Sequence, residues 1–170
     1  MIRKQVVFIA LCIFTSMAIS RGQNSATNRD PRIGTWKLNL DKSQYTTGGL
    51  PAPKMQMRRL EVWNDGFTVF TQSGLDEQNN PVFIQVTYKL DAKKYPEYTQ
   101  TTLPQFSTSG TTPNMNTYRL SGTDTVEITR FDSAGQVTGT SVQVMSQDGR
   151  THTAIAKDAS GGGIEQGYET

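Results

Sequence analysis

Apolar and polar residues alternate along most of the chain after the first 30 residues, with the period of two typical of β-strands that bury one face. The clearest example is the segment 82–90, VFIQVTYKL, whose alternate positions are apolar or aromatic. Segments 67–72 and 125–131 repeat this pattern, and 137–145 and 151–157 follow it with threonine at many positions. We find no segment there with the 3.6-residue period of an amphipathic helix. The pattern predicts an all-β domain.

The segment 55–63, MQMRRLEVW, alternates in two different phases. Its apolar positions are Met55 and Met57 in one phase, then Leu60 and Val62 in the other. A change of phase within one strand is typical of a β-bulge, in which one extra residue is inserted opposite the neighbouring strand. We therefore expect a bulge at Arg58-Arg59, with both methionines at the mouth of the domain interior.

Turn signals separate the predicted strands. Asn64-Asp65-Gly66 and Asp148-Gly149 are typical of hairpins, because these residue types tolerate a positive φ. Aspartates recur at the other breaks, where their carboxylates can bond the backbone. An up-and-down antiparallel barrel of about eight to ten strands closes such a meander without open edges. A β-sandwich is the alternative, but short connections favour pairing between neighbours in sequence.

The segment 96–117 interrupts this rhythm. It holds three prolines, many threonines and little charge, and it is too long for a hairpin turn. Long loops in compact domains are often functional lids or mobile connections. A mobile polar loop containing an edge strand is one interpretation, and a segment that contacts another protein or an envelope component is the other.

The first 20 residues predict a secretory signal peptide. Arg3 and Lys4 precede an almost wholly apolar run over 5–19, and Ala18 and Ser20 provide small residues for cleavage after Ser20. A membrane anchor is less favoured, because a spanning helix needs ~20 apolar residues. We expect a secreted or periplasmic protein with no stable membrane anchor after cleavage.

Residues 21–30 are polar and aperiodic and predict a flexible N-terminal arm, which leaves 31–170 as one domain. The single cysteine, Cys12, lies in the leader, so the mature chain would have no disulfide and no thiol nucleophile. The chain has 17 basic and 15 acidic side chains, and loss of Arg3 and Lys4 makes the two numbers equal. This balance argues against nucleic acid as a partner.

The stretch 34–45, GTWKLNLDKSQY, carries a G-x-W element at the start of the first predicted strand. It resembles the first motif of lipocalins and related calycin barrels, and more closely a group of small secreted bacterial lipocalin-like proteins. Those proteins read G-T-W-K-L-N followed by K-S-x-Y/F. Further matching pieces are YKLDAKKYP (88–96), TVEITRF (125–131), GQVTGTSVQVMSQDGRT (135–151) and the closing GYE (167–169).

The resemblance implies a secreted barrel whose cavity holds a small apolar molecule. Physical reasoning supports a structural role for the motif itself. A buried Trp36 needs a partner for its N–H, and Gly34, which lacks a side chain, lets a neighbouring strand or loop approach closely. Together with the resemblance, this favours Gly34 and Trp36 as residues that close one end of the barrel; the alternative is a core tryptophan with an incidental glycine in another β fold. Arg119, Arg130 and Arg150 are candidate partners for the tryptophan.

Catalytic patterns are weak in this sequence. His152 is the single histidine, and no zinc-binding or serine-hydrolase motif is present, so we expect neither a metal nor a cofactor nor an enzymatic activity. His152 shares its predicted strand face with Ala154 and Ala156, which favours a simple strand histidine over a haem ligand. A calycin-like enzyme, such as an isomerase, or a haem protein that uses His152 is the remaining alternative.

These observations favour a non-enzymatic, lipocalin-like protein that binds a small hydrophobic or amphipathic molecule inside the barrel. The alternative is a filled barrel that acts as an interaction module through 96–117. Candidate ligand-binding residues lie on the apolar strand faces and at three polar positions. They are Trp36, Met55, Met57, Val82, Ile84, Val86, Tyr88, Arg119 and Arg130.

Overall fold

The computed structural model describes residues 30–46, 51–99 and 113–170. The predicted signal peptide, residues 21–29 of the predicted arm and residues 100–112 of the 96–117 segment lie outside the described residues. Ten strands and one short 3-10 turn occur in the described part of the chain. They are β1 (Gly34–Tyr45), β2 (Met55–Val62), η1 (Asn64–Gly66), β3 (Thr68–Leu75), β4 (Pro81–Tyr88), β5 (Asp91–Thr99), β6 (Asn114–Ser121), β7 (Thr125–Phe131), β8 (Val137–Met145), β9 (Thr151–Asp158) and β10 (Gly163–Glu169).

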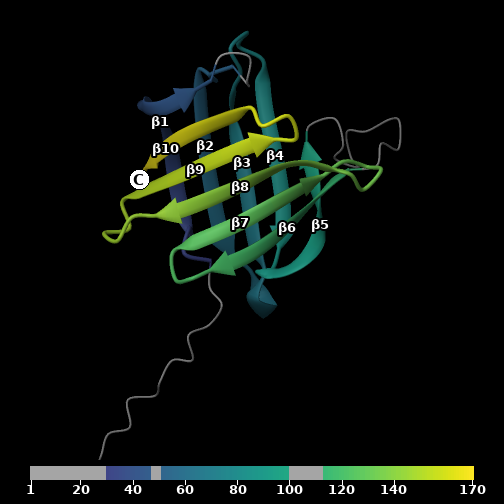
Figure 1. Cartoon of the computed structure of the whole chain (residues 1–170). Coiled ribbons are helices and arrows are strands. Elements are labelled where there is room, and N and C mark those ends of the chain that lie inside the picture. The colour runs from purple at the N-terminus through teal and green to yellow at the C-terminus, as the bar shows by residue number, and fades with distance from the viewer. Residues whose placement is uncertain (1–29, 47–50, 100–112) are drawn as a thin grey trace, which may run out of the picture.

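The strands form a closed antiparallel barrel in which each strand pairs with its neighbours in sequence. Pairing of β1 with β10, for example Leu38 opposite Tyr168, closes the circle. Figure 1 shows β6–β10 running across the front of the barrel, with β2–β4 behind them. The fold is therefore the up-and-down barrel that the hydrophobic alternation and the turn spacing predict.

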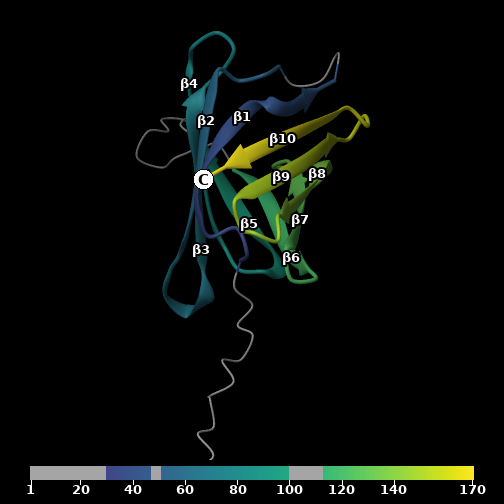
Figure 2. The ribbon, with the colours of Figure 1, turned by 90° about the vertical axis from the view of Figure 1, so that its left-hand side faces the viewer.

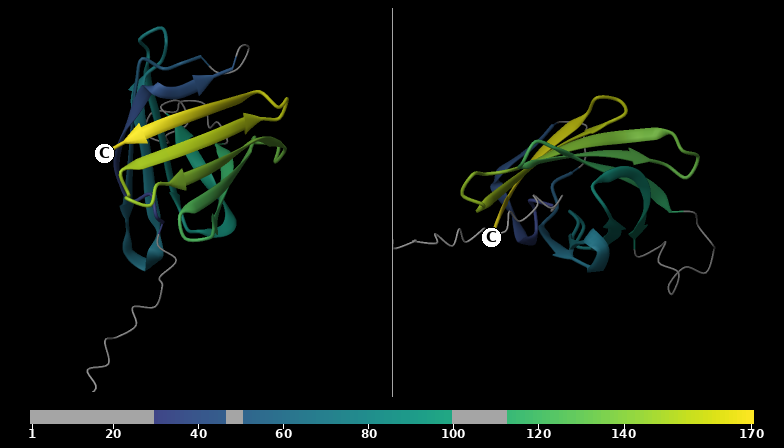
Figure 3. Two further views of the ribbon diagram at one scale, coloured as in Figure 1. Left: turned by 60° about the vertical axis from the view of Figure 1, so that its left-hand side comes forward. Right: turned by 90° about the horizontal axis from the view of Figure 1, so that it is seen from below.

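The barrel has two walls, β2–β4 and β7–β10, whose strands run in clearly different directions (Figure 2). In Figure 2, β2–β4 stand upright on one side, and β7–β10 lie on the other. The two views of Figure 3 show the same strands obliquely and from below, with β5 and β6 linking the two walls. No α-helix occurs among the described residues, and no helix there could cross a membrane.

Hairpin turns form where the sequence predicts them. Asp65 and Gly66 adopt φ values of 61° and 75° between β2 and β3, and Gly149 adopts 69° between β8 and β9. Aspartate carboxylates accept hydrogen bonds from backbone N–H groups two or four residues further along the chain. These residues are Asp76, Asp132, Asp148 and Asp158. Local side-chain bonding thus stabilises the turns that set the strand register.

Two hydrophobic clusters fill one end of the barrel, where β1 begins and β10 ends. One cluster contains Trp36, Leu38, Leu60, Met145, Ala154 and Tyr168. The other contains Val86, Tyr88, Tyr118, Val126 and Ile128. We call this the closed end. The opposite end, where β1 ends and β10 begins, is called the open end.

The predicted orientation of β2 is wrong. Met55 and Met57 are 46% and 41% exposed, whereas Gln56, Arg58 and Leu60 are buried. No bulge interrupts the strand, because β2 pairs with β3 without a shift from Met55 to Val62. The inward-facing positions of β2 are Leu60 and, on the same face, the polar residues Arg58 and Gln56. A search for alternating apolar residues therefore does not find this face.

Two predicted boundaries also change. Asp30, the last residue of the predicted arm, is buried in the barrel. Both ends of the segment 96–117 belong to strands, because β5 extends to Thr99 and β6 begins at Asn114. The connection between the two strands is therefore shorter than the whole segment. The proposed interaction role of this segment depends largely on residues 100–112 and stays a prediction.

The orientation of β2 can be tested by substitution. Leu60→Ala should lower the free energy of unfolding by about 2–5 kcal/mol, because it leaves a cavity in the closed end. Met57→Ala should change it by about 0.5 kcal/mol or less, because the side chain lies on the surface. Urea unfolding followed by tryptophan fluorescence measures both values. Equal losses for the two variants would contradict the inward phase described here.

Candidate functional site

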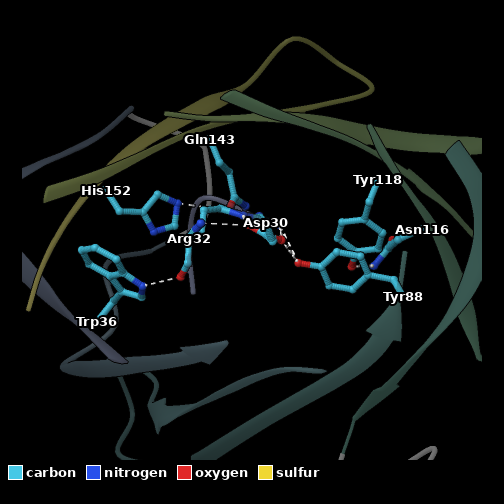
Figure 4. A network of polar contacts seen from close by, with 8 residues as sticks. All are labelled: Asp30, Arg32, Trp36, Tyr88, Asn116, Tyr118, Gln143 and His152. Carbon is cyan, nitrogen blue, oxygen red and sulfur yellow. Dashed lines mark hydrogen bonds and ion pairs between the residues drawn. The ribbon is translucent and has the colours of Figure 1, made fainter. Parts of the chain in front are cut away.

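The centre of the barrel is occupied by a buried arginine from the segment just before β1 (Figure 4). Arg32 is 1% exposed. Its Nε lies 2.9 Å from Asp30 Oδ1 and its Nη2 lies 2.7 Å from Asp30 Oδ2, so the pair is bidentate. Its other terminal nitrogen, Nη1, donates to Gln143 Oε1 at 2.5 Å. The chain entering the barrel therefore brings its own ion pair into the interior.

Asp30 is held as a carboxylate by its neighbours. Burial by itself raises the pKa of Asp30, but the charge and hydrogen bonds of Arg32, with a further hydrogen bond from Tyr88, lower it below its ordinary value. Tyr88 Oη donates to Asp30 and accepts from Arg32 Nη2 at 2.5 Å. Burial raises the pKa of Tyr88 well above its usual value, so this hydroxyl stays protonated. Asp30 is therefore a carboxylate, Arg32 a cation and Tyr88 a neutral hydroxyl, as their hydrogen bonds require.

The tyrosine side of the network is a stacked pair. The rings of Tyr88 and Tyr118 lie 3.7 Å apart at 13° between planes. Asn116 lies beside them, and its amide nitrogen donates to Glu97 Oε2 at 2.7 Å. Because a carboxylate can only accept, this bond orients the amide and leaves Asn116 Oδ1 pointing elsewhere; that buried oxygen has no hydrogen-bond partner.

On the other side, Trp36 anchors the entering segment. Its indole Nε1 donates to the backbone carbonyl of Arg32 at 2.8 Å. Gly34 has a φ of +148°, and a Cβ there would lie 3.5 Å from the same indole nitrogen. The close neighbour of Gly34 is therefore the ring of Trp36 rather than another strand. The G-x-W element places a buried tryptophan at the closed end and ties it to Arg32, not to Arg119, Arg130 or Arg150.

His152 packs between the rings of Trp36 and Tyr168, with centroids 5.7 Å and 5.3 Å away. Its Nε2 lies 3.1 Å from Gln143 Oε1, an acceptor, so this nitrogen carries the hydrogen and Nδ1 is left without a partner. Burial, followed by repulsion from Arg58 and Arg32, lowers the pKa of His152 well below its usual value. The ring is therefore neutral.

A second buried arginine lies beside this network without a carboxylate. Arg58 Nε donates to Gln72 Oε1 at 3.1 Å and Nη2 donates to Gln166 Oε1 at 3.2 Å. Its guanidinium carbon lies 4.1 Å from the centroid of the Tyr168 ring. Nη1 is buried and has no hydrogen-bond partner. Within the described ranges, the ion pairs do not include Arg58.

Two spaces adjoin these side chains. An inner chamber of about 20 Å³ is lined by Arg32, Arg58, Phe70, Gln72, Ile84, Glu97, Asn116, Tyr118, Ile128, Arg130 and Gln143. An outer cavity of about 400 Å³ lies at the open end, where its walls include Asn114, Thr138, Ala156, Lys157 and Ile164. Glu97, Asn116 and Arg130 line both spaces, so the two meet at these residues.

The structure brings some of the predicted ligand-binding residues into the interior. Ile84 and Arg130 line the inner chamber, whereas Val86 and Tyr88 are fully buried in the closed end. Val82 lines a separate hollow between β2 and β4 at the open end. Trp36 is buried at the closed end and does not line either space.

Three predicted residues point away from the barrel interior, although Met55 lines the same hollow at the open end as Val82. Met55 and Met57 are exposed because the inward phase of β2 is the opposite one. Arg119 is exposed and pairs with Glu127 across β6 and β7. In each strand the neighbouring positions face inward, namely Gln56 and Arg58 in β2 and Tyr118 in β6.

Sequence reasoning missed most of the polar interior. The buried polar residues include Asp30, Arg32, Gln56, Arg58, Asn116, Gln143 and Gln166. The sequence did contain one signal for Arg58. It lies two residues before Leu60 in the same strand, so the two side chains share a face, and burial of Leu60 implies burial of Arg58. The described part of the chain contains no cluster of His, Cys, Asp and Glu that could hold a metal ion.

Removing the carboxylate at position 30 should destabilise the fold. In Asp30→Asn the buried guanidinium of Arg32 loses its counter-charge, which should cost about 3–5 kcal/mol in the free energy of unfolding. In the wild type, the stabilisation from the lowered pKa of Asp30 is present above about pH 4 and is lost as the pH falls further. Urea titrations measure both effects. The control is Glu127→Gln, which breaks an exposed pair and should change little; a similar loss in both variants would contradict the argument.

His152 should make stability depend on pH. The folded protein keeps the ring neutral, whereas the unfolded chain binds a proton below about pH 6.5, so stability should fall with decreasing pH by up to about 1.4 kcal/mol per unit. His152→Phe keeps a ring at this position and should flatten the curve. Unfolding measured between pH 5 and 8 compares the two proteins. Parallel curves would show that His152 does not titrate in this way.

Comparison with known proteins identifies the fold. No protein-family model matches the sequence, and no curated protein matches it. Among solved structures, a point mutant of the fluorescent protein UnaG has a TM-score of 0.52 at 13% identity, covering 82% of this chain and 95% of that one. Wild-type UnaG has a TM-score of 0.51 at 13% identity, covering 81% and 95%. The chain therefore has the closed, calycin-like barrel fold that the sequence resemblance implied.

Proposed function

We propose that this protein binds a small amphipathic molecule inside the open end of its barrel and catalyses no reaction. The observation that carries this proposal is the outer cavity of about 400 Å³, which adjoins an inner chamber lined by residues with unpartnered polar atoms. A cavity of this size is within the range of small-molecule sites, and barrels of about eight strands can hold one small ligand.

The lining of the cavity favours an amphipathic ligand over a purely hydrophobic one. Ala156 and Ile164 supply apolar surface in the outer cavity, together with glycines at 139, 162 and 163. The inner chamber is bordered by arginine, glutamine and asparagine side chains as well as Phe70 and Ile84. A wholly apolar molecule would leave these buried polar groups without partners, which costs free energy.

The direction of entry follows from the same arrangement. The closed end is filled by Trp36, Leu60 and the other members of the two hydrophobic clusters, so a ligand would enter from the open end. We also propose that the protein acts outside the cytoplasm, after removal of residues 1–20. The mass of the mature protein isolated from its host tests this second point, because an intact leader would contradict it.

Binding can be tested with the neutral fluorescent probe N-phenyl-1-naphthylamine. The wild type should bind the probe saturably with increased fluorescence. Ala156→Trp should weaken binding about tenfold or more, because Ala156 lines the outer cavity and the indole fills space that the probe needs. The matched control is Ile155→Trp, because Ile155 is 40% exposed and lies on the outer face of the same strand.

Two results would overturn this proposal. One is the absence of saturable binding by the wild type. The other is equal binding by the wild type and Ala156→Trp, which would place the probe on the surface. Native mass spectrometry of protein purified from its own host provides an independent measurement, because a retained ligand adds a discrete mass.

A further inference from the structure

Two residues that line the inner chamber each keep one buried polar atom without a hydrogen-bond partner, and the two atoms have complementary hydrogen-bonding capacity. Arg58 Nη1 is a charged donor without an acceptor, and Asn116 Oδ1 is an acceptor without a donor. Both residues line the same small space. Buried polar groups in proteins are nearly always paired, so each unpartnered atom requires an explanation. A ligand that supplies both missing partners would account for the pair.

The charge balance of this region is positive. Arg32, Arg58 and Arg130 border the inner chamber, and Glu97 is the carboxylate among the residues that line it. Asp30 lies next to the chamber and is engaged by Arg32. The two remaining arginines have no ion-pair partner among the described residues. An uncompensated guanidinium in a buried site is costly, and an anionic oxygen is the group that relieves this cost most directly.

The asparagine adds a second requirement to the ligand. Asn116 Nδ2 is committed to Glu97, so the side chain cannot rotate its amide group without losing that bond and placing two acceptors together. Its free oxygen can therefore accept a hydrogen bond only from an O–H or N–H group that enters the chamber. A simple carboxylate has no such donor when ionised.

The sizes of the two spaces determine how a ligand is arranged. The inner chamber has room for only one or two water-sized groups, so only the tip of a polar head group enters it, and the rest of the head group lies where the chamber meets the outer cavity, at Asn116 and Arg130. The outer cavity is about twenty times larger and contains the apolar surface of Ala156 and Ile164. The body of the molecule lies there.

From this geometry we infer that the ligand is a small amphipathic carboxylic acid with an O–H or N–H donor next to its carboxylate, of the kind found in 2-hydroxy acids. The carboxylate lies against Arg58 and Arg130, and the donor binds Asn116 Oδ1. This inference rests on the proposed function, because it assigns the ligand class of the same cavity. It goes further by naming the two atoms that select the head group.

Three matched compounds test the inference by isothermal titration calorimetry at pH 7. They are 2-hydroxyoctanoate, octanoate, which lacks the donor, and 1,2-octanediol, which lacks the charge. The wild type should bind 2-hydroxyoctanoate about fivefold or more tightly than octanoate, and about tenfold or more tightly than the diol. Equal affinity for all three would show that water satisfies the two atoms and would overturn the inference.

Variants assign the effect to the two side chains. Asn116→Leu removes the acceptor and should bind the two acids equally. Arg58→Gln removes the charge and should bind 2-hydroxyoctanoate and the diol with similar affinity. The control, Arg119→Gln, removes an exposed arginine on the outer face and should bind all three compounds like the wild type. If Arg58→Gln does not fold, the wild-type series and Asn116→Leu still decide the matter.

The outcome separates this inference from the proposed function. If the neutral naphthylamine probe binds in the cavity but the three octyl compounds do not, or do not differ, the ligand class is wrong and the binding function stands. If the probe also fails to bind, both are wrong.

Discussion

The buried ion pair between Asp30 and Arg32 is the interaction on which the rest of the interior depends. Two charges from the entering segment are taken into the barrel, where each is stable only with the other in place. The backbone carbonyl of Arg32 holds Trp36, and its guanidinium bonds Gln143 and Tyr88. Through Gln143 the network reaches His152. One short segment thereby links the two hydrophobic clusters of the closed end (Figure 4).

This arrangement divides the barrel interior into two regions that differ in how completely their polar groups are paired. At the closed end, aromatic and aliphatic side chains of the two hydrophobic clusters pack around the ion pair. Toward the open end, Arg58 and Asn116 each keep a buried polar atom without a hydrogen-bond partner. Both line the inner chamber with Arg130, and Asn116 and Arg130 also line the outer cavity. Polar groups that satisfy one another stabilise the fold, whereas polar groups left unsatisfied are available to a ligand. Arg32, which is paired with Asp30, is an example of the first case, and Arg58, whose Nη1 has no partner, is an example of the second.

The calycin-like fold by itself does not specify a ligand, because similar barrels carry different interiors. Here the interior differs from a simple apolar pocket in its three arginines and in the amides that surround them. This polarity is why we propose a ligand with a charged head and an apolar body rather than a purely hydrophobic one.

Much of the architecture followed from the sequence alone. Alternation of apolar residues and turn signals such as Asn64-Asp65-Gly66 act locally, so they predicted a closed meander of about the right number of strands. The G-x-W element likewise indicated a buried Trp36. Arg58 could not be placed in the same way, because an arginine in a strand is ordinarily expected to face water. Its position depends on the register between β2 and β3.

The sequence by itself thus determined the strands, the turns and the tryptophan of the closed end, since these depend on residues near one another in the chain. Only the tertiary structure decided which polar side chains occupy the interior. Arg32 meets Gln143 across 111 positions of sequence, and Arg58 meets Gln166 across 108. Such pairs form only when the barrel closes. Closure removes water from these side chains, and a buried polar or charged group is stable only if it hydrogen-bonds to another group, here one from a distant strand.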